Sequence, residues 1–347
     1  MHPEIDNNKC NNCGLCYKAC PLNSYENKNT YPIATYAMQN NNLQVLEKSS
    51  SGGAFYALAE KTINNGGVVY GCAFQNRKAV HKRADSISDL LSLLGSKYVQ
   101  SDVRCFRDVK KDLLSEIPVL FSGTPCQVAG LKSFLKKDYP NLICVDFICH
   151  GVPSPKVLDL YLDACEKQYN APVTHVEFRN KRFGWSKFAM RLVNNDTEIL
   201  CESRKTNLYL KTFLTNTSIR TSCGKCRFNT LPRQADITLG DFWGANIEIE
   251  DIEKGLSVLA VNSDNGLKIF NDIKDDFKVY PITLEDIKRG NPFINGHCTL
   301  AKKRDLFFKH IDNKEITQNM NECIIPTISE YIKGIITYKI KTIFKKR

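Results

Sequence analysis

Apolar and polar positions alternate in blocks that predict helices and strands by turns in the first half of the chain. Apolar runs predict strands at Val68–Phe74, Ile117–Phe121 and Leu142–Ile148. Helical patterns cover Ala54–Ile63, Asp85–Leu94, Phe106–Leu114, Gln127–Lys137 and Pro155–Gln168. Strands that alternate with helices in this way predict an α/β fold with a mostly parallel sheet.

The pattern changes after about Pro172. Short strands are predicted at Val173–Phe178, Phe188–Val193, Thr197–Cys201, Asp236–Leu239 and Leu256–Val261. Asn194-Asn195 is typical of a hairpin turn between two of these strands. We therefore expect the C-terminal half to be α+β.

Composition indicates a folded protein with unusual cysteine chemistry. The 347 residues are 42% hydrophobic and 24% charged, and the start, Met1 to Lys9, has no apolar core of a signal peptide. No apolar run is long enough to cross a membrane, so a cytoplasmic protein is expected. Fifteen cysteines in a reducing compartment favour metal ligands or catalytic thiols over disulfides.

Much of the net charge of +11 comes from the C-terminal tail, which has six basic residues and no acid from Tyr331 to Arg347. No zinc-finger or RNA-recognition signature accompanies the charge, so a nucleic-acid partner is not expected. Isoleucines at helical spacing, interrupted by Lys339 and Lys346, predict a basic amphipathic tail over residues 326–347. Such a helix can lie on an anionic membrane face, or it can be solvated or dock on a partner.

The N-terminal cysteines have the spacing of a bacterial ferredoxin: Cys10, Cys13, Cys16, and then Cys20 followed by Pro21. This spacing predicts a 4Fe-4S cluster, with a zinc knuckle as the alternative. In two-cluster ferredoxins the fourth cysteine binds the other cluster, which needs a second run. The chain has one run, so we expect that an upstream run is missing, either truncated or never present.

Four internal cysteines stand in special surroundings: Cys126, Cys149, Cys223 and Cys226. The first two each follow a predicted strand, and ligands gather at the carboxyl ends of strands in open α/β sheets. The last two form a CxxC pair. Together they could hold a second 4Fe-4S cluster. The alternative is two buried, inert thiols and a CxxC that binds zinc or nothing. The other seven cysteines are interpreted as structural.

A series of ordered motifs resembles the coenzyme F420 hydrogenase/dehydrogenase beta-subunit family up to about residue 310. They are Ser49-Ser-Ser-Gly-Gly53, Gly95-Ser-Lys-Tyr-Val-Gln100, Gly123-Thr-Pro-Cys-Gln127, Cys149-His-Gly-Val-Pro153, Phe178-Arg-Asn-Lys181, the CxxC pair and Ala235-Asp-Ile-Thr-Leu-Gly-Asp-Phe-Trp-Gly244. Within the family, the chain looks most similar to bacterial members associated with surface-polysaccharide biosynthesis. The resemblance implies a flavoprotein that passes electrons between 4Fe-4S clusters and an organic acceptor.

The flavin is expected to be FAD or FMN, and coenzyme F420 is possible but not indicated. A helix N-terminus after a Ser/Gly loop suits a phosphate or a flavin edge. The candidate cofactor-binding residues are Ser51, Gly52, Gly53, Lys97, Gly123, Thr124 and Pro125. His150 is the candidate proton donor, with a purely hydrogen-bonded histidine as the alternative.

These patterns divide the chain into four expected parts. Residues 1–30 form a partial ferredoxin-type segment, 45–170 and 171–310 form a flavin-binding domain with a mixed sheet, and 326–347 form the tail. The preferred function is an oxidoreductase that uses a ferredoxin or another redox protein as its partner. The alternative is an electron-transfer subunit without its own substrate that docks on a catalytic partner.

Overall fold

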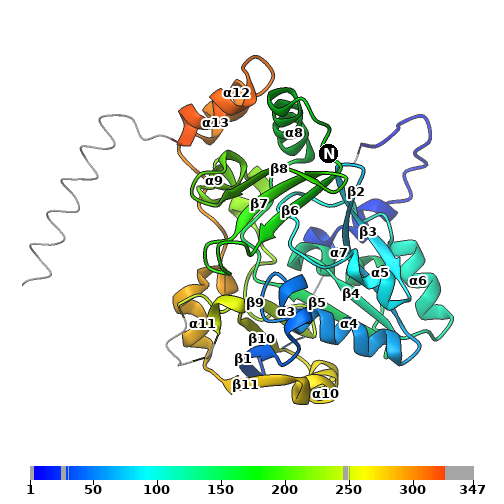
Figure 1. Cartoon of the computed structure of the whole chain (residues 1–347). Coiled ribbons are helices and arrows are strands. Elements are labelled where there is room, and N and C mark those ends of the chain that lie inside the picture. Colours follow the sequence, from blue (N-terminus) through cyan, green and yellow to red (C-terminus); the bar gives the residue numbers. More distant parts are fainter. Residues whose placement is uncertain (1–3, 25–28, 30, 245–248, 250, 325–347) are drawn as a thin grey trace, which may run out of the picture.

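The computed structural model describes residues 4–24, 29, 31–244, 249 and 251–324 (Figure 1). The expected amphipathic tail, residues 326–347, lies outside the described residues, and so do residues 1–3, 25–28 and 30 of the expected ferredoxin-type segment. Among the helices that are described, none is long and apolar enough to cross a membrane.

An eight-stranded sheet forms the centre of the molecule (Figure 1). Its order is β11-β1-β10-β9-β5-β4-β2-β3. The strands are β1 (Ala34–Asn40), β2 (Val68–Gln75), β3 (Lys78–Ala84), β4 (Val119–Ser122), β5 (Leu142–Phe147), β9 (Ile237–Asp241), β10 (Ser257–Val261) and β11 (Phe277–Pro281).

The sheet is parallel in the middle and antiparallel at both sides. Strands β2, β4, β5 and β9 run parallel to one another. The pairs β2–β3, β9–β10, β10–β1 and β1–β11 are antiparallel. The α/β class and the expected mixed sheet are confirmed, but the mostly parallel sheet expected from the first half of the chain is wrong, because four of the seven strand pairings are antiparallel. Strands from both 45–170 and 171–310 join this one sheet.

Helices cover both faces of the large sheet. On one face, α4 (Ala54–Asn64) and α10 (Asp264–Ile273) pack their apolar sides onto β1, β2 and β10. On the other face, α6 (Phe106–Leu114) and α7 (Pro125–Leu135) cover β4 and β5. The remaining helices near this sheet are α3 (Leu43–Lys48), α5 (Ile87–Leu91) and α11 (Leu284–Gly290).

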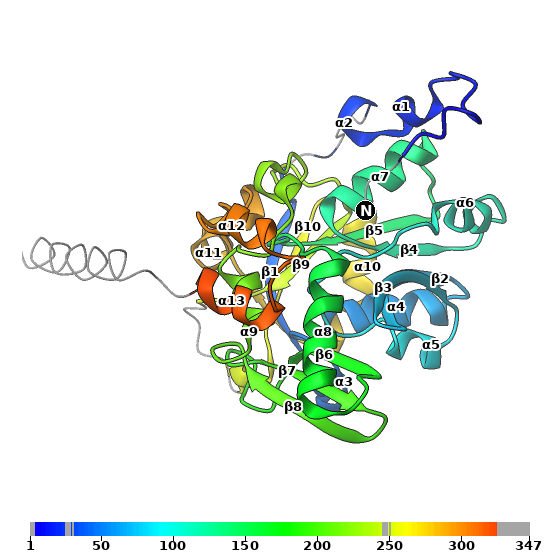
Figure 2. The ribbon, with the colours of Figure 1, turned by 90° about the horizontal axis from the view of Figure 1, so that it is seen from above.

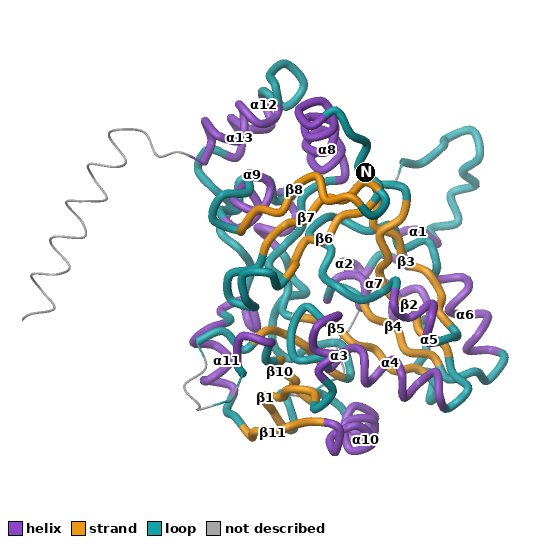
Figure 3. Tube along the Cα trace, in the orientation of Figure 1, coloured by secondary structure: helices purple, strands orange, loops and turns teal. Residues whose placement is uncertain are grey.

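A smaller antiparallel sheet has a core of its own (Figure 3). It contains β6 (His175–Asn180), β7 (Ala189–Asn194) and β8 (Thr197–Ser203), in this order, and the predicted hairpin turn joins the last two. The helices that share this core are α8 (Pro155–Tyr169), α9 (Leu208–Leu214), α12 (Arg304–Lys309) and α13 (Ile316–Ile324). Single-turn helices complete the fold: η1 (Thr221–Lys225), η2 (Ile252–Lys254), η3 (Lys274–Asp276) and η4 (Pro292–Asn295).

The N-terminal cysteine segment lies at the edge of the molecule, on helix α7 (Figure 2). It contains two short helices, α1 (Leu15–Ala19) and α2 (Pro21–Ser24), and both contact α7. No residue of α1 is buried. The side-chain amide of Asn29 donates to the carbonyls of Arg233 and Ala235 at 2.9 and 3.0 Å.

Candidate redox centre

Three loops at one edge of the large sheet carry the internal cysteines. Because β4 and β5 are parallel neighbours, the loops that follow them emerge side by side. Cys126 is the second residue of α7, after β4, and Cys149 follows β5. Cys223 lies within η1 and Cys226 directly after it. An antiparallel bridge between Pro153 and Ile219 joins the Cys149 loop to the segment before η1.

The four cysteines are mutual neighbours. Thiolates repel one another over short distances in a protein, and each of the six pairs among Cys126, Cys149, Cys223 and Cys226 shows this repulsion. Burial raises the pKa of Cys149 well above its ordinary value, and the neighbouring cysteines raise it further. Desolvation by the surrounding protein, followed by Cys226 and Cys223, raises the pKa of Cys126 to about 11. Four thiols held together in this way form a donor set for a metal that displaces their protons.

Cys126 is exposed, whereas the other three cysteines of the group are half-buried. The group is therefore open to solvent on the side of Cys126. The hydroxyl of Thr124 lies 3.1 Å from the Cys126 sulfur. The side chain of Gln127 accepts from the backbone N–H of Thr124 at 2.9 Å and so caps helix α7. The predicted cofactor residues Thr124 and Pro125 therefore begin the helix that holds Cys126, and the start of a helix favours a thiolate.

A fifth cysteine, Cys298, lies beside the CxxC pair. Burial raises its pKa to about 11, and Cys223 and Cys226 contribute. Both the Cys298 sulfur and the Cys223 Cβ lie within 3.6 Å of the point where a Cβ of Gly151 would stand. Sequence reasoning treated Cys298 as structural, because no spacing relates it to another cysteine. It interacts with the CxxC side of the group, whereas the other four all interact with one another.

A single zinc ion and a 4Fe-4S cluster place different demands on the positions of four cysteine sulfurs. Zinc draws its sulfurs to about 2.3 Å from one point. Within the part of the chain that the structure describes, no three His, Cys, Asp or Glu side chains converge in that way. A 4Fe-4S cluster binds each thiolate to a different iron, so its ligands stand further apart. The four internal cysteines thus supply thiolate donors of the kind that a zinc ion or a 4Fe-4S cluster binds.

The N-terminal cysteines stand apart from this group. Cys10, Cys13 and Cys16 are exposed, and Cys20 is half-buried at the end of α1. Gly14, between the second and third cysteines, has a φ of 69°, a left-handed conformation that glycine adopts without strain. The segment's own packing is slight, as expected of a piece that needs its metal to fold.

The Ser/Gly loop is held by the sheet. The Ser51 hydroxyl donates to the carbonyl of Leu256 at 2.8 Å, and the N–H of Gly52 donates to the Ser257 hydroxyl at 2.9 Å. A Cβ at Gly52 would lie 2.3 Å from the Met38 carbonyl oxygen. Gly53 has a φ of 87° and precedes α4. The donors of Ser51 and Gly52 are thus engaged within the protein.

Residues 95–101 connect this loop to the cysteines. At one end, the N–H of Ser96 donates to the Ser50 hydroxyl at 2.7 Å. At the other end, the N–H of Gln100 donates to the carbonyl of Pro153, in the Cys149 loop, at 3.0 Å. Lys97, between them, donates to the carbonyls of Leu93 and Leu94 at 3.0 and 2.6 Å. Burial lowers the pKa of Lys97 to about 8.

Two buried polar atoms beside this segment have no hydrogen-bond partner, Ser49 Oγ and Gln100 Oε1. Such orphan atoms are uncommon in a folded protein and can mark a place where a ligand completes the network. Together with the ammonium of Lys97 and the small residue Gly123, they fit a polar, anionic cofactor next to the cysteines. The flavin-binding prediction is therefore compatible with Lys97 and Gly123, whereas Ser51 and Gly52 are used to build the sheet.

His150 is enclosed rather than open. Its ring lies 4.9 Å from Phe213 and 4.8 Å from Phe293, centre to centre. The Asn216 amide nitrogen donates to the Thr299 carbonyl, so the Asn216 oxygen faces His150. This oxygen accepts a hydrogen bond from His150 Nε2 at 2.6 Å. Burial lowers the pKa of His150, which keeps the ring neutral at pH 7. This arrangement suits a ring that positions the Cys149 loop.

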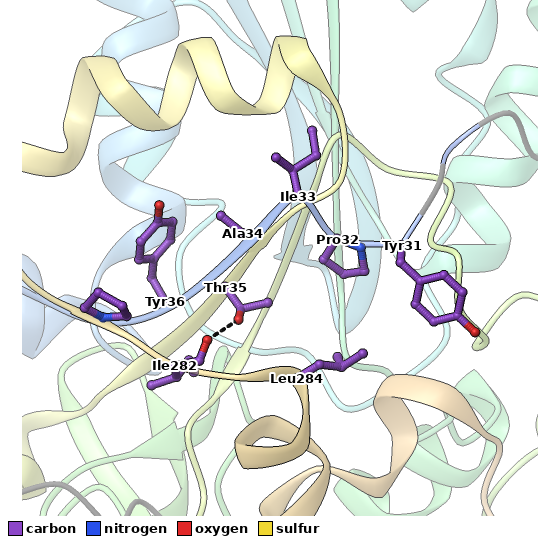
Figure 4. A pocket seen from close by; sticks show the side chains of 9 residues that line it. Tyr31, Pro32, Ile33, Ala34, Thr35, Tyr36, Ile282 and Leu284 are labelled. Atoms are coloured by element: carbon purple, nitrogen blue, oxygen red, sulfur yellow. Dashed lines mark hydrogen bonds between the residues drawn. The ribbon is translucent and has the colours of Figure 1, made fainter.

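A cavity of ≈ 370 Å³ opens elsewhere, between the chain that leads into β1 and the end of β11 (Figure 4). Its lining is mostly apolar, with Tyr31, Ile33 and Leu284 around the Thr35 hydroxyl, which donates to the Ile282 carbonyl at 2.5 Å. None of the predicted site residues lines this cavity.

Known proteins resemble this chain in two separate ways. Residues 118–286 match the family described as the C terminus of the coenzyme F420 hydrogenase/dehydrogenase beta subunit, and residues 2–27 match a 4Fe-4S binding domain. No curated protein sequence matches the chain.

A similar fold occurs in a chain of the F420-reducing [NiFe] hydrogenase complex from Methanosarcina barkeri, solved in a xenon derivatization study. The two share 18% identity with a TM-score of 0.52, over 84% of this chain and 92% of that one. Both matched families are redox families, so the chain has an oxidoreductase-type role in electron transfer. Residues 118–286 are thus similar to the C terminus of the coenzyme F420 hydrogenase/dehydrogenase beta subunit, and residues 2–27 are similar to a 4Fe-4S binding domain.

Proposed function

We propose that this chain is an iron–sulfur flavoprotein oxidoreductase with an internal 4Fe-4S cluster bound by Cys126, Cys149, Cys223 and Cys226. Electrons pass between the N-terminal ferredoxin-type segment, the internal cluster and a flavin, FAD or FMN, and on to an organic substrate. The observation that carries the proposal is that the three loops bring these four thiols close enough for each pair to interact electrostatically. Cysteines that serve only in packing need not lie near one another, whereas the ligands of one cluster must.

The position of the N-terminal segment supports a relay. Helices α1 and α2 contact α7, and Cys126 is the second residue of α7. One helix therefore contacts the N-terminal cysteine segment and carries a ligand of the internal cluster. A bound flavin would link the one-electron chemistry of the clusters to the two-electron chemistry of organic molecules.

The flavin is proposed to lie along residues 95–101. Lys97 supplies positive charge, and Gln100 Oε1 and Ser49 Oγ supply polar groups that need partners. The chain itself binds and orients the cofactor, and the enclosed His150 ring keeps the Cys149 loop in place. We propose, from the motif resemblance alone, a cytoplasmic setting in surface-polysaccharide biosynthesis, with a ferredoxin or similar protein as electron partner.

A second candidate is an electron-transfer subunit that docks on a catalytic partner. Four large apolar side chains of the N-terminal segment are exposed, namely Ile5, Leu15, Tyr17 and Leu22. Exposed apolar groups concentrated in one small segment are typical of an interaction site. A partner that covers them would receive or deliver electrons directly at this segment.

The proposal is tested by iron, sulfide and flavin analysis of anaerobically purified protein, wild type beside Cys149→Ser and Cys165→Ser. Cys149→Ser is expected to lose about four irons per chain, because one of four ligands is removed. Cys165 is a buried thiol of α8 in a different core, so Cys165→Ser should keep the wild-type iron content.

Two results would contradict the proposal. If Cys149→Ser kept all the iron of the wild type, the internal cluster would not exist as assigned. If iron were present without any flavin after purification and reconstitution, the electron-transfer subunit would replace the flavoprotein as the better interpretation.

A further inference from the structure

A chain of buried polar side chains runs from the middle of the large sheet to the Cys149 loop. The Thr238 hydroxyl, on β9, donates to Asp146 Oδ1, on β5, at 2.6 Å. Arg233 Nε lies 3.6 Å from the other oxygen of Asp146, and both side chains are fully buried, with 0% exposed. A buried ion pair of this kind adds little net stability, so its presence calls for another explanation.

Arg233 continues the chain toward the cysteines. Its Nη2 donates to the Phe147 carbonyl, at the end of β5, at 3.0 Å. Its Nη1 donates to Asn229 Oδ1 at 2.8 Å. The cation thus lies between the Asp146 carboxylate and the Asn229 amide, and it fixes which way that amide points.

Asn229 then fixes two loops of the redox centre. Its Nδ2 donates to the carbonyl of Cys149 at 2.8 Å and to the carbonyl of Gly296 at 2.6 Å. The N–H of Gly296 returns a hydrogen bond to the Asn229 carbonyl at 2.7 Å. Gly296 precedes Cys298 by two residues, so a single buried amide, 2% exposed, holds the backbone beside both cysteines.

We propose that Asn229 and Arg233 are positioning residues for the internal cluster: Asn229 fixes the Cys149 loop, and Arg233 sets the cluster's reduction potential. The inference rests on the proposed function, since it requires a cluster at Cys149. Neither side chain is a ligand. Groups just outside the ligands that hold and polarise them are known to tune metal sites strongly.

The direction of the electrostatic effect follows from charge. Reduction adds one negative charge to the cluster, and a buried cation nearby stabilises that charge in the low dielectric of the interior. Asp146 opposes the effect, but the guanidinium lies between Asp146 and the cysteines. Removal of both charges should therefore make the reduction potential more negative.

The potential is tested with the full-length double variant Arg233→Met/Asp146→Asn, which avoids an unpaired buried charge and keeps an acceptor for Thr238. The potential of the cluster that Cys149→Ser abolishes is measured by redox titration with EPR detection. Arg83→Met is the matched control. Arg83 also pairs with an aspartate, Asp112. It lies on β3, the edge strand next to β2, and not on the strands that carry the buried chain.

The loop-fixing role is tested by anaerobic chelation. Asn229→Ala should bleach the cluster about tenfold faster than the wild type in excess chelator, the size of effect expected when a group that holds a ligand is lost. Asn262→Ala is the control, because Asn262 is equally buried and donates to Thr238 at the far end of the same chain. It should bleach at the wild-type rate.

The results separate the two proposals. A wild-type protein without a Cys149-dependent cluster would overturn the proposed function itself. With that cluster present, the inference is wrong if Asn229→Ala bleaches no faster than Asn262→Ala, or if the double variant has the potential of Arg83→Met. If the double variant binds no iron, Arg233→Lys decides: it keeps the charge, so a wild-type potential is expected and a shift as large as that of Arg233→Met alone contradicts the electrostatic role.

Discussion

At the scale of single residues, one ammonium group shows how closely the chain is tied together around the Ser/Gly loop. Lys181 Nζ donates to the carbonyls of Leu46, Ser51 and Lys254 at 2.7, 3.2 and 2.5 Å. Burial lowers its pKa to about 8. Three segments that are distant in sequence therefore meet at one side chain, next to the loop that the sequence identified as a cofactor contact.

Two glycines in this molecule should respond oppositely to the same substitution. Gly52→Ala would place a Cβ 2.3 Å from the Met38 carbonyl oxygen and 2.6 Å from the Ser257 nitrogen, so backbone would have to move. We expect a loss of about 3 kcal/mol or more in the free energy of unfolding. Gly130→Ala, inside α7, meets only Phe106 at 3.5 Å and should stabilise by up to about 1 kcal/mol. Urea unfolding of both variants gives the comparison, and similar effects in the two would contradict this packing.

Site residues that lie at a fixed spacing in the chain could be recognised from the sequence. Residues that reach the site only when distant segments fold together could not. Cys223 and Cys226 are recognised by their CxxC spacing. Cys298 and Asn229 carry no such signal, because only the folding of separate loops brings Cys298 to the CxxC pair and Asn229 to Cys149. In the Ser/Gly loop, a glycine is required at position 52 because the backbone there lies close to Met38 of β1 and Ser257 of β10. No local sequence pattern reveals this contact.

At the scale of elements, the N-terminus of helix α7 is both the capped end of the helix and the place of Cys126. Its first residues supply the cap, the Thr124 hydroxyl beside Cys126, and Cys126 itself. Thr124→Val keeps the side-chain shape and removes that hydroxyl. The variant should therefore lose iron faster than the wild type under a chelator, with little change in secondary structure by circular dichroism.

Thr283→Val is the matched control for this prediction. Thr283 caps α11, where its hydroxyl accepts from the N–H of Asp286 at 3.2 Å, and α11 carries none of the cysteines. It should lower the free energy of unfolding by about 1 kcal/mol without changing iron retention. Equal iron loss in the two threonine variants would mean that a general loss of stability, and not the hydroxyl at Cys126, is responsible.

Elements with a strong pattern were found from the sequence, and those set by distant pairing were not. The predicted helix at Phe106–Leu114 is confirmed to the residue, and the predicted strand at Leu142–Ile148 forms as Leu142–Phe147. Strands β1, β3 and β11 were missed. β1 follows a polar segment and exists because β10 and β11 flank it, and the alternating polar residues of β3 face solvent at the edge of the sheet.

At the scale of the whole molecule, the N-terminal segment contacts the rest of the protein mainly through helix α7. Residues 4–24 bury little, whereas Asn29 keeps its two hydrogen bonds to the body. A chain that lacks residues 1–24 should therefore keep the thermal stability of the full chain within a few degrees and retain the internal cluster. Calorimetry and iron analysis test this, and loss of the Cys149-dependent iron in that chain would show that the segment helps to build the internal site.

The class of the fold could be predicted because strands and helices alternate, but the sheet's outer strands could not. Parallel order was inferred for strands that follow one another through helices, which holds for β2, β4 and β5. The antiparallel side is made by β1 from the start of the chain and by β10 and β11 from its second half. Sequence order alone does not reveal which distant strands pair.

That arrangement has a consequence for how the protein is made. Ala37 of β1 lies opposite Val258 of β10 on one side and Tyr280 of β11 on the other, so β1 has no neighbour until most of the chain has left the ribosome. Cys223 and Cys226 also emerge late. A nascent chain therefore carries an unpaired strand and half a ligand set throughout most of its synthesis, conditions under which chaperones bind exposed strands. If Cys223 and Cys226 bind the proposed internal cluster, that cluster is completed only after both have left the ribosome.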